Sequence, residues 1–243
     1  MVKVSIVIPA RNEAANIDAL LNEIAAACTP VADHEVIVVD DGSDDATSQA
    51  VQARMANHDN LRLIRHDRSA GQSAAVHSGV LAAKAGIVCT LDGDGQNPPA
   101  ELPKLFLPLL ADGAEAIGIV AGQRVGRQDT LSKKLASRFA NGLRGWALRD
   151  GTRDTGCGLK AFRRDAFLRL PFFNHMHRYL PALFARDGWQ VAHVDVSHRP
   201  RGAGRSNYNN LQRGLVGAVD LFGVMWLLRR RKTSAPVELR KGG

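Results

Sequence analysis

The sequence has few cysteines and few aromatic residues, and each shortage argues against a class of protein. Its three cysteines, Cys28, Cys89 and Cys157, are spaced too widely for a zinc site or a disulfide framework. We therefore expect reduced thiols in a cytosolic protein. Aromatic residues make up 5% of the chain and do not alternate with basic residues, which argues against a platform for single-stranded nucleic acid. We expect no nucleic-acid partner.

Familiar nucleotide-binding and targeting motifs are missing as well. The chain contains no G-x-x-x-x-G-K-[ST] loop, and no G-x-G-x-x-G follows its first apolar run. These absences disfavour a P-loop NTPase and a dinucleotide-dependent dehydrogenase. The first apolar run is also shorter than the apolar region of a signal peptide and has no cleavage pattern. We therefore expect the protein on the cytoplasmic side of the membrane.

The chain does have a large apolar fraction and an excess of positive charge. Apolar residues make up 45% of its 243 residues, which is enough for a substantial core, and the formal net charge is +8. A basic protein of this kind is expected to bind an anionic partner, such as a phosphate-bearing small molecule or an anionic membrane. The length suits one domain, with or without a short appendage.

Apolar runs alternate with helical patterns through the first half of the sequence. Strands are expected at residues 4–8, 34–39, 61–64, 87–91 and 116–121, with a further strand at 191–196. Nearly continuous apolar strands separated by helices are typical of a parallel sheet covered on both faces, an α/β fold. Ser43 is the expected N-cap of the helix after the second strand, with Asp44 and Asp45 in its first turn.

An acidic segment at residues 91–99 is the main candidate for a binding site. The run LDGDGQNPP at residues 91–99 follows the strand at 87–91 and delivers Asp92 and Asp94 into a loop. Two nearby carboxylates favour a hard cation, Mg²⁺ or Mn²⁺, which would hold a diphosphate. An ordinary turn is the alternative, because Asp and Gly are common in turns. Polar clusters at residues 9–13 and 40–43 also follow strands, where parallel sheets bind ligands, and so favour the metal site.

The carboxyl-terminal segment is apolar but interrupted. Residues 211–228 approach the length of a membrane span, yet Arg213 and Asp220 would each cost about 3 kcal/mol at a bilayer centre. We expect an amphipathic helix at the membrane interface, with the basic residues 229–232 on anionic headgroups. A terminal helix packed on the core is the alternative. The expected division is a catalytic domain at 1–210, the interfacial helix at 211–232 and a disordered tail at 233–243.

Several motifs together resemble a known family. They are PARNE at 9–13, VDDGSDDAT at 39–47, LDGDGQNPP at 91–99, GQR at 122–124, SRFAN at 137–141, TGCGLK at 155–160 and RGAGRS at 201–206. This combination resembles inverting family-two glycosyltransferases, and within them polyprenyl-phosphate glycosyltransferases of the dolichol-phosphate mannose synthase type. The chain departs from the family pattern at Arg11, where the family usually has Tyr, and at Asn207, where it often has Lys.

The resemblance implies a GT-A fold with a mostly parallel central sheet, and a nucleotide-sugar donor of the GDP-mannose or UDP-glucose type. It implies a nucleotide site made by six residues of the first two strand ends: Pro9, Ala10, Asn12, Glu13, Asp40 and Asp41. It also implies that Asp92, Asp94 and Gln96 hold Mg²⁺ or Mn²⁺, and that the metal stabilises the leaving nucleoside diphosphate.

The implied acceptor is a polyprenyl phosphate, undecaprenyl or dolichyl phosphate. Its phosphate oxygen is anionic at neutral pH and needs no general base, but it does need cations to orient it. The expected acceptor-binding residues are Arg124, Arg138 and Arg201, because guanidinium groups match phosphate oxygens. Arg205 and Ser206 are expected to close a loop over the donor diphosphate. Asp92, Asp94, Arg124 and Arg138 are the expected catalytic residues. The enzyme would act at the membrane surface as a peripheral or monotopic protein.

Two other functions remain open at this point. The same fold could transfer sugar to a hydroxyl of a glycan or glycolipid, with Asp154 or Asp187 as general base. A non-catalytic nucleotide-sugar-binding scaffold on the membrane is the second alternative. The pair His175 and His177 is interpreted as structural, because no third metal ligand is evident nearby. Arg144 is expected at the surface or facing the membrane.

Overall fold

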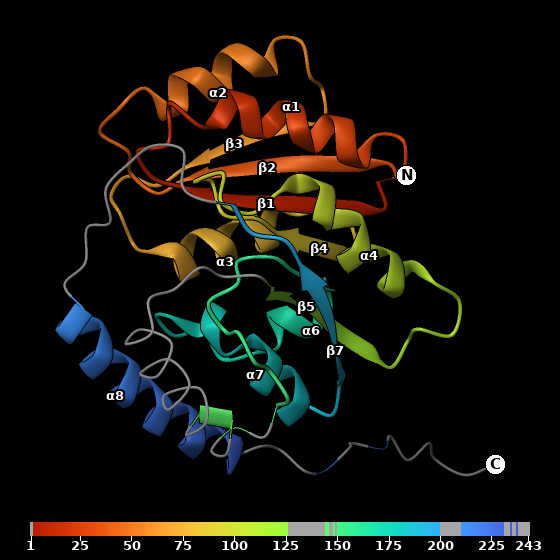
Figure 1. The fold of residues 1–243 in the computed structure, drawn as a ribbon, viewed down its shortest axis with the longest axis vertical. Coiled ribbons are helices and arrows are strands. Elements are labelled where there is room, and N and C mark those ends of the chain that lie inside the picture. The colour runs from red at the N-terminus through yellow and green to blue at the C-terminus, as the bar shows by residue number, and fades with distance from the viewer. Residues whose placement is uncertain are drawn as a thin grey trace.

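A seven-stranded sheet forms the centre of the computed structural model (Figure 1), which describes residues 2–125, 144–145, 148, 150–199, 210–230, 234 and 237. The strand order is β3-β2-β1-β4-β6-β5-β7. The strands are β1 Val4–Ala10, β2 His34–Asp40, β3 Leu61–Arg65, β4 Ile87–Thr90, β5 Ile117–Arg124, β6 Lys160–Arg163 and β7 Gln190–Val196.

Most neighbouring strands in this sheet run parallel, as the apolar runs predict. β1 pairs in parallel with β2 and β4, β2 with β3, and β5 with β7. β6 is the exception, because it lies antiparallel between β4 and β5. The carboxyl ends of the parallel strands therefore meet at one edge, and the segment that leads into β6 arrives at that same edge.

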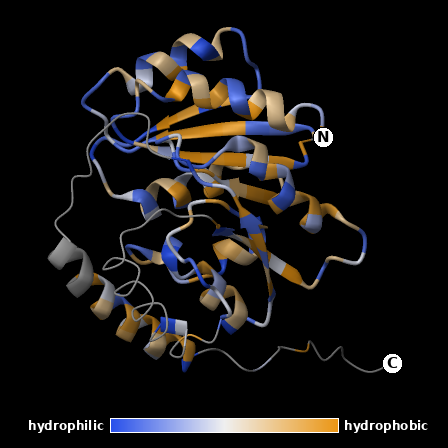
Figure 2. Cartoon of the chain, in the orientation of Figure 1, coloured by the Kyte–Doolittle hydropathy of each residue, from blue (hydrophilic) through white to orange (hydrophobic). Residues whose placement is uncertain are grey.

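Helices cover both faces of the sheet because successive strand residues point to opposite sides. On β1, Ile6 and Ile8 join one buried cluster with α1 and α4, whereas Val7 joins a second cluster with α3, α6 and α7. Figure 2 shows the hydrophobic colouring along the central strands. The helices are α1 Ile17–Cys28, α2 Thr47–Met55, α3 Gln72–Ala82, α4 Leu102–Leu110, α6 Arg164–Leu168, α7 Leu180–Arg186 and α8 Asn210–Leu228, with 3-10 turns η1 Pro99–Glu101 and η2 Met176–Arg178.

The expected N-cap at Ser43 is wrong, because α2 begins four residues later, at Thr47. The Ser43 backbone N–H donates to Asp40 Oδ1 at 2.8 Å, and its hydroxyl accepts a hydrogen bond from the Asn12 N–H at 3.0 Å. Asp45 instead accepts a hydrogen bond from the Thr47 N–H at 2.9 Å. Residues 43–46 thus form a loop that binds the neighbouring strand end before the helix starts.

The terminal helix α8 has two different faces. Leu221, Met225 and Leu228 pack beside the buried Val224 against the second cluster. Exposed apolar side chains occupy other positions of the helix: Val216, Val219, Phe222 and Trp226. Among the described residues, no helix has both the length and the hydropathy needed to cross a membrane. The predicted boundaries after residues 210 and 232 remain predictions, and only two residues of the expected tail, 234 and 237, are described.

Candidate functional site

The polar clusters at the ends of β1, β2 and β4 come together at one edge of the sheet. Ala10 lies opposite Asp40 in the parallel register of β1 and β2. A Cβ on Gly93 would lie 3.2 Å from the Pro9 carbonyl oxygen, so the acidic loop after β4 runs against the end of β1. Three segments that are far apart in sequence therefore form one surface.

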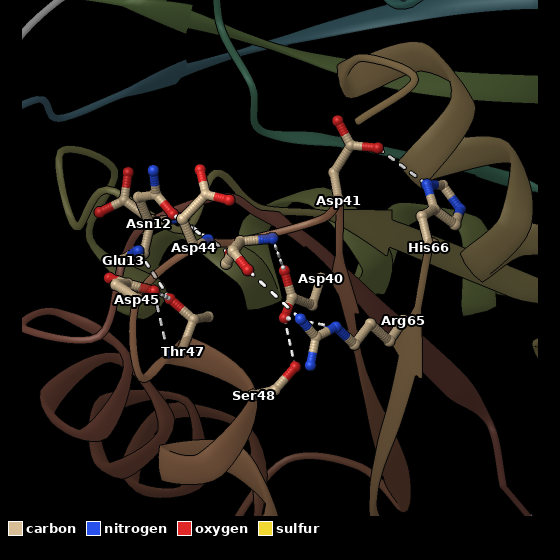
Figure 3. A network of polar contacts seen from close by, with 11 residues as sticks. Asn12, Glu13, Asp40, Asp41, Asp44, Asp45, Thr47, Ser48, Arg65 and His66 are labelled. Carbon is tan, nitrogen blue, oxygen red and sulfur yellow. Dashed lines mark hydrogen bonds and ion pairs between the residues drawn. The ribbon is translucent and has the colours of Figure 1, made fainter. Parts of the chain in front are cut away.

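The loops after β1 and β2 are interlocked by hydrogen bonds (Figure 3). The Asn12 N–H donates to Ser43 Oγ at 3.0 Å, and Asn12 Oδ1 accepts from the Asp44 N–H at 2.9 Å. The Glu13 N–H donates to Thr47 Oγ1 at 2.9 Å. Asn12 adopts a left-handed conformation, with φ 58°, which Asn tolerates better than most residues. The candidate nucleotide loop thus has a single, well-defined backbone path.

Asp41 is the centre of the second half of this network. Its carboxylate is buried and accepts four hydrogen bonds: from His66 Nδ1 at 2.8 Å, Ser69 Oγ at 2.7 Å, and the N–H groups of Ala70 and Gly71 at 2.9 Å each. Burial alone would raise the pKa of Asp41, but these hydrogen bonds outweigh it and hold the pKa below its usual value. Asp41 is therefore ionised at neutral pH and satisfied by its own chain.

Asp40 is also held internally. It is fully buried, accepts hydrogen bonds from the Ser43 N–H and the Ser48 hydroxyl, and lies 4.0 Å from the Arg65 guanidinium. The two aspartates expected at the nucleotide therefore also fix the loops that surround the candidate site.

Asp92 lies in a different environment. Gln72 Nε2, at the start of α3, donates to its Oδ1 at 2.7 Å, and Asn97 Nδ2 donates to its Oδ2 at 3.3 Å. Burial raises the pKa of Asp92 to about 6, and the negative charge of Asp94 adds to the rise. The charges of Lys160 and Arg124 oppose that rise without cancelling it. In the absence of a cation, this carboxylate has less stabilisation than Asp41.

A second acidic residue and an amide lie in the same loop. Asp94 Oδ1 accepts a hydrogen bond from the Gln96 N–H at 3.1 Å, which closes a tight turn through Gly95. Gly95 has a φ of 69°, a left-handed conformation that glycine adopts without steric cost. This turn holds Asp94 and Gln96 on one short segment beside Asp92.

Basic residues approach the acidic loop from β5 and β6. Arg124 binds Asp154 through two contacts, Nε to Oδ2 at 2.6 Å and Nη2 to Oδ1 at 2.9 Å. The Lys160 ammonium is buried and donates to the Cys157 carbonyl. Burial lowers the pKa of Lys160, whereas the charges of Cys157 and Asp92 partly restore it. Positive charge therefore acts on Asp92 from two neighbouring strands.

The glycine-rich turn before β6 makes room for the acidic loop. A Cβ on Gly158 would lie 2.1 Å from Asp92 Oδ2. Any side chain at position 158 would therefore displace the Asp92 carboxylate. A Cβ on Gly156 would lie 3.0 Å from an Arg124 amino group. The TGCGLK motif thus allows the backbone to pass close to both charged groups.

The residues present fit a hard cation held jointly by protein and ligand. The candidate donors would be the carboxylates of Asp92 and Asp94 with the amide oxygen of Gln96. Asn97 Oδ1 is buried with no hydrogen-bond partner in the described part of the chain. No group of three or more His, Cys, Asp and Glu side chains that could hold a metal exists among the described residues. A cation here would complete its coordination with diphosphate oxygens and water, as Mg²⁺ commonly does.

The structure thus brings nine of the predicted site residues to one edge, with Arg124 beside them: Pro9, Ala10, Asn12, Glu13, Asp40, Asp41, Asp92, Asp94 and Gln96. The other predicted phosphate-binding residues, Arg138, Arg201, Arg205 and Ser206, lie outside the described residues.

Arg144 differs from its predicted surface position. It is 8% exposed, and its Nη2 forms an ion pair with Asp150 at 2.5 Å while Nη1 donates to the Thr152 carbonyl. A buried guanidinium with this many partners holds the chain before β6 and does not face solvent.

The two histidines have separate partners, as their structural interpretation predicts. His175 Nδ1 lies 2.9 Å from Asp220 Oδ2 on α8, and His177 Nδ1 lies 2.8 Å from Ser73 Oγ on α3. Burial lowers the pKa of His177 well below its usual value. The pair therefore connects three elements and makes no common metal site.

Sequence reasoning gave no role to three residues that surround Asp92: Gln72, Asn97 and Lys160. Asn97 and Lys160 stand inside recognised motifs, so their positions carried a signal that could have been used. Gln72 carried none, because its contact with Asp92 joins residues 20 positions apart.

Comparisons with known proteins agree with this arrangement. The model of glycosyl transferase family 2 matches residues 5–170. Undecaprenyl-phosphate 4-deoxy-4-formamido-L-arabinose transferases are among the similar curated proteins. That of Aeromonas hydrophila subsp. hydrophila is 32% identical over 97% of this chain and 69% of its own length. That of Photorhabdus laumondii subsp. laumondii is 31% identical over 98% of this chain and 70% of its own length.

Solved structures share the fold at lower sequence identity. Glucosyl-3-phosphoglycerate synthase from Mycobacterium tuberculosis, in complex with Mn²⁺, UDP and glucosyl-3-phosphoglycerate, superposes with a TM-score of 0.69 and 22% identity, over 93% of this chain and 79% of that one. Its complex with Mg²⁺ and UDP gives a TM-score of 0.68 with 22% identity and the same two coverages.

Proposed function

The chain belongs to glycosyl transferase family 2, and we propose that this glycosyltransferase moves a sugar from a nucleotide sugar to a polyprenyl phosphate with inversion. One observation carries the proposal. Relatives named for transfer to undecaprenyl phosphate match this chain along 97–98% of its length, through both the acidic loop and the basic second half. Undecaprenyl phosphate is therefore the first acceptor to test.

The donor would bind with its diphosphate at the acidic loop. Asp92, Asp94 and Gln96 would hold Mg²⁺ or Mn²⁺, which neutralises the charge that develops on the departing nucleoside diphosphate. Pro9, Ala10, Asn12 and Glu13 would line the nucleoside, and the internally held Asp40 and Asp41 keep these loops in place. Gln72 and Asn97 orient the Asp92 carboxylate through its two oxygens.

The acceptor phosphate would approach from the side of Arg124. Its oxygen is already anionic, so the protein's task is orientation and charge compensation, with no proton to remove. Asp154 binds one edge of the Arg124 guanidinium through Nε and Nη2 and fixes its plane, and Nη1 of the same group would bind a phosphate oxygen. Arg138 and Arg201 are proposed to share this role, and Arg205 and Ser206 are proposed to bind the donor diphosphate.

The ion pair of Asp154 weakens the alternative of a hydroxyl acceptor. A hydroxyl needs a general base, and a carboxylate that binds a guanidinium at 2.6 and 2.9 Å is stabilised in its charged form and is a poor base. Asp187 pairs with its neighbour Arg186 at 3.1 Å, at the end of α7. Neither carboxylate is therefore a good candidate for a general base. This favours a phosphate acceptor, which needs no general base.

The exposed face of α8 is proposed to bind the membrane that carries the lipid acceptor. Val219 and Phe222 are 71% and 72% exposed, Trp226 is 59% exposed, and Arg229 and Arg230 follow at the end of the helix. Exposed apolar side chains followed by basic residues match the boundary between acyl chains and anionic headgroups. A location at the cytoplasmic face stays a prediction.

A donor and acceptor screen tests the proposed reaction. Purified protein with Mg²⁺ or Mn²⁺ is incubated with undecaprenyl phosphate and, in turn, GDP-mannose, UDP-glucose and nucleotide-linked 4-deoxy-4-formamido-L-arabinose. We expect one donor to yield a glycosylated lipid phosphate, and no product from undecaprenol, which lacks the phosphate. Equal transfer to undecaprenol, or to a free sugar, would favour the hydroxyl-acceptor alternative.

Vesicle binding tests the membrane proposal separately. The double variant Phe222→Ser/Trp226→Ser should lose most co-sedimentation with phosphatidylglycerol-containing vesicles. Leu107→Ser is the matched control, since Leu107 is 46% exposed on α4, away from α8 in sequence. Equal vesicle binding by the double variant and the wild type would remove α8 from the membrane contact.

A further inference from the structure

Arg199 lies three residues after the end of β7 and makes three contacts, two with the acidic loop and one with α1. Its backbone N–H donates to the Gln96 carbonyl at 3.0 Å, and its Nε donates to the Gly95 carbonyl. Its Nη2 donates to Glu23 Oε1 on α1 at 3.0 Å. One residue therefore connects β7, the acidic loop and α1.

The two carbonyl contacts matter more than the ion pair. Arg199 and Glu23 are each 40% exposed, and exposed ion pairs contribute about 0–1 kcal/mol to stability. The carbonyls of Gly95 and Gln96, in contrast, belong to the turn that carries Asp94 and Gln96. Gly95 has a left-handed φ of 69° and gives the turn more conformational freedom than another residue would. Hydrogen bonds to both carbonyls reduce that freedom.

A second contact holds the segment that follows β7. The Ser197 hydroxyl donates to Glu101 Oε1 at 2.8 Å, in the 3-10 turn that follows the acidic loop. Arg199 also lines a cleft of about 200 Å³ together with Asp94, Gly95 and Asn16. Residues 197–199 thus bind both the acidic loop, at Gly95 and Gln96, and the turn that follows it, at Glu101.

We propose that Arg199 is a positioning residue, which fixes the acidic loop so that Asp94 and Gln96 hold the divalent cation and the donor diphosphate. The inference rests on the proposed function, and it deepens that function by adding a residue outside the recognised motifs. Arg199 also lies two residues before the RGAGRS motif, so the contact with the acidic loop is close in sequence to the predicted phosphate-binding residues.

Two substitutions at position 199 test this role. Arg199→Met keeps an unbranched side chain similar to the stem of arginine and removes its donors. Arg199→Lys keeps the charge but cannot bind Gly95 and Glu23 through a rigid fork. Binding of Mn²⁺ alone is measured by the loss of the free-ion electron paramagnetic resonance signal, and kcat and KM are measured in the transfer assay. Thermal unfolding of each variant is recorded in parallel.

We expect Arg199→Met to weaken Mn²⁺ binding about tenfold and to lower kcat about 10- to 100-fold, because small displacements of positioned groups reduce rates this strongly. The KM for the lipid phosphate should change less than about twofold. Arg199→Lys should recover part of both losses. A folded Arg199→Met with wild-type Mn²⁺ binding and kcat would overturn the proposal. If Arg199→Met does not fold, wild-type values in Arg199→Lys would overturn it.

Matched controls separate positioning from loss of a surface ion pair. Glu23→Gln removes the ion pair but leaves both carbonyl contacts, and should stay within about twofold of wild type in both measurements. Arg54→Ala removes another arginine that pairs with α1, through Asp18 at 3.6 Å, and should also bind Mn²⁺ normally. An equal loss in Glu23→Gln would assign the effect to the ion pair and overturn the role of the carbonyl contacts.

The Mn²⁺ measurement also distinguishes this proposal from the proposed reaction. If the wild-type protein binds Mn²⁺ but transfers no sugar to undecaprenyl phosphate, the proposed function fails while the role of Arg199 at the acidic loop is still decided by the binding data. If the wild-type protein transfers sugar and Arg199→Met binds Mn²⁺ as tightly, the role of Arg199 fails while the reaction stands.

Discussion

Two pairs of aspartates lie at strand ends on the same edge of the sheet, Asp40 and Asp41 at β2 and Asp92 and Asp94 after β4. The two pairs differ in how fully the surrounding chain stabilises their charge. Asp41 after β2 accepts four hydrogen bonds from its own chain, and its pKa lies below the usual value. Asp92 after β4 accepts two side-chain hydrogen bonds, and burial with the nearby charge of Asp94 raises its pKa to about 6. The first site is complete without a ligand, whereas the second gains most from a cation.

The largest difference between the two pairs is expected in catalysis. Asp94→Ala removes one of the two carboxylates that we propose hold the cation, and should lower metal-dependent transfer about 10²- to 10³-fold, as loss of one electrostatic contact to a developing charge commonly does. Initial rates at saturating donor and Mn²⁺ measure the effect. The thermal midpoint should change little, since relief of the repulsion with Asp92 opposes the loss of the hydrogen bond from the Gln96 N–H. Retained full activity would remove Asp94 from the site.

The opposite variant should act mainly on stability. Asp41→Ala leaves four donors in partly buried hydrogen bonds without their acceptor and should lower the free energy of unfolding by about 2–4 kcal/mol. Urea denaturation of the metal-free protein measures this loss. Asp44→Ala is the control, because Asp44 is exposed and should change stability by less than about 0.5 kcal/mol. Equal losses in both variants would contradict the internal role of Asp41.

The pH dependence of stability should have opposite signs at the two sites. Because the folded pKa of Asp41 is lowered, its contribution is present above the ordinary value of about 3.9 and is lost as the pH falls through the folded value. The folded pKa of Asp92 is raised to about 6, so its contribution is present below about pH 4 and is lost as the pH rises through 6.

Asp92→Asn tests the second sign directly. In the presence of a chelator, this variant should be about 1–3 kcal/mol more stable than the wild type at pH 7, and the difference should shrink towards pH 4. Urea denaturation at both pH values gives the comparison. A variant that is less stable than the wild type at pH 7 would show that the Asp92 charge is already well compensated by Lys160 and Arg124.

The smallest effect is expected at Gln72. Gln72→Ala removes one hydrogen bond to Asp92 from an exposed side chain, which is worth about 1 kcal/mol, or roughly fivefold in kcat. Gln49→Ala, another exposed glutamine on a helix, is the matched control and should leave kcat unchanged. A Gln72→Ala variant with wild-type kcat would leave Asn97 as the sufficient partner of Asp92.

The sequence predicted the strands and the edge at which they end, because apolar periodicity and strand-end polar clusters are local signals. Partners that lie far apart in sequence could not be predicted. The hydrogen bonds from residues 66–71 to Asp41, and the pairing of Arg124 with Asp154, join residues 25–30 positions apart. The same limit explains Ser43, whose local context resembles a helix cap but whose hydroxyl binds Asn12, 31 positions away.

The placement of β6 has a consequence for how the chain assembles. β6 lies between β4 and β5, although both precede it in sequence, and Phe162 pairs with Val88 on one side and with Ile119 on the other. Strands β1 to β4 can join as soon as they are synthesised, but β5 has no edge to meet until residues 160–163 arrive. Contacts of such long sequence separation form slowly. The donor half of the enzyme can therefore fold first, and the acidic loop gains its basic neighbours only in a later step of folding.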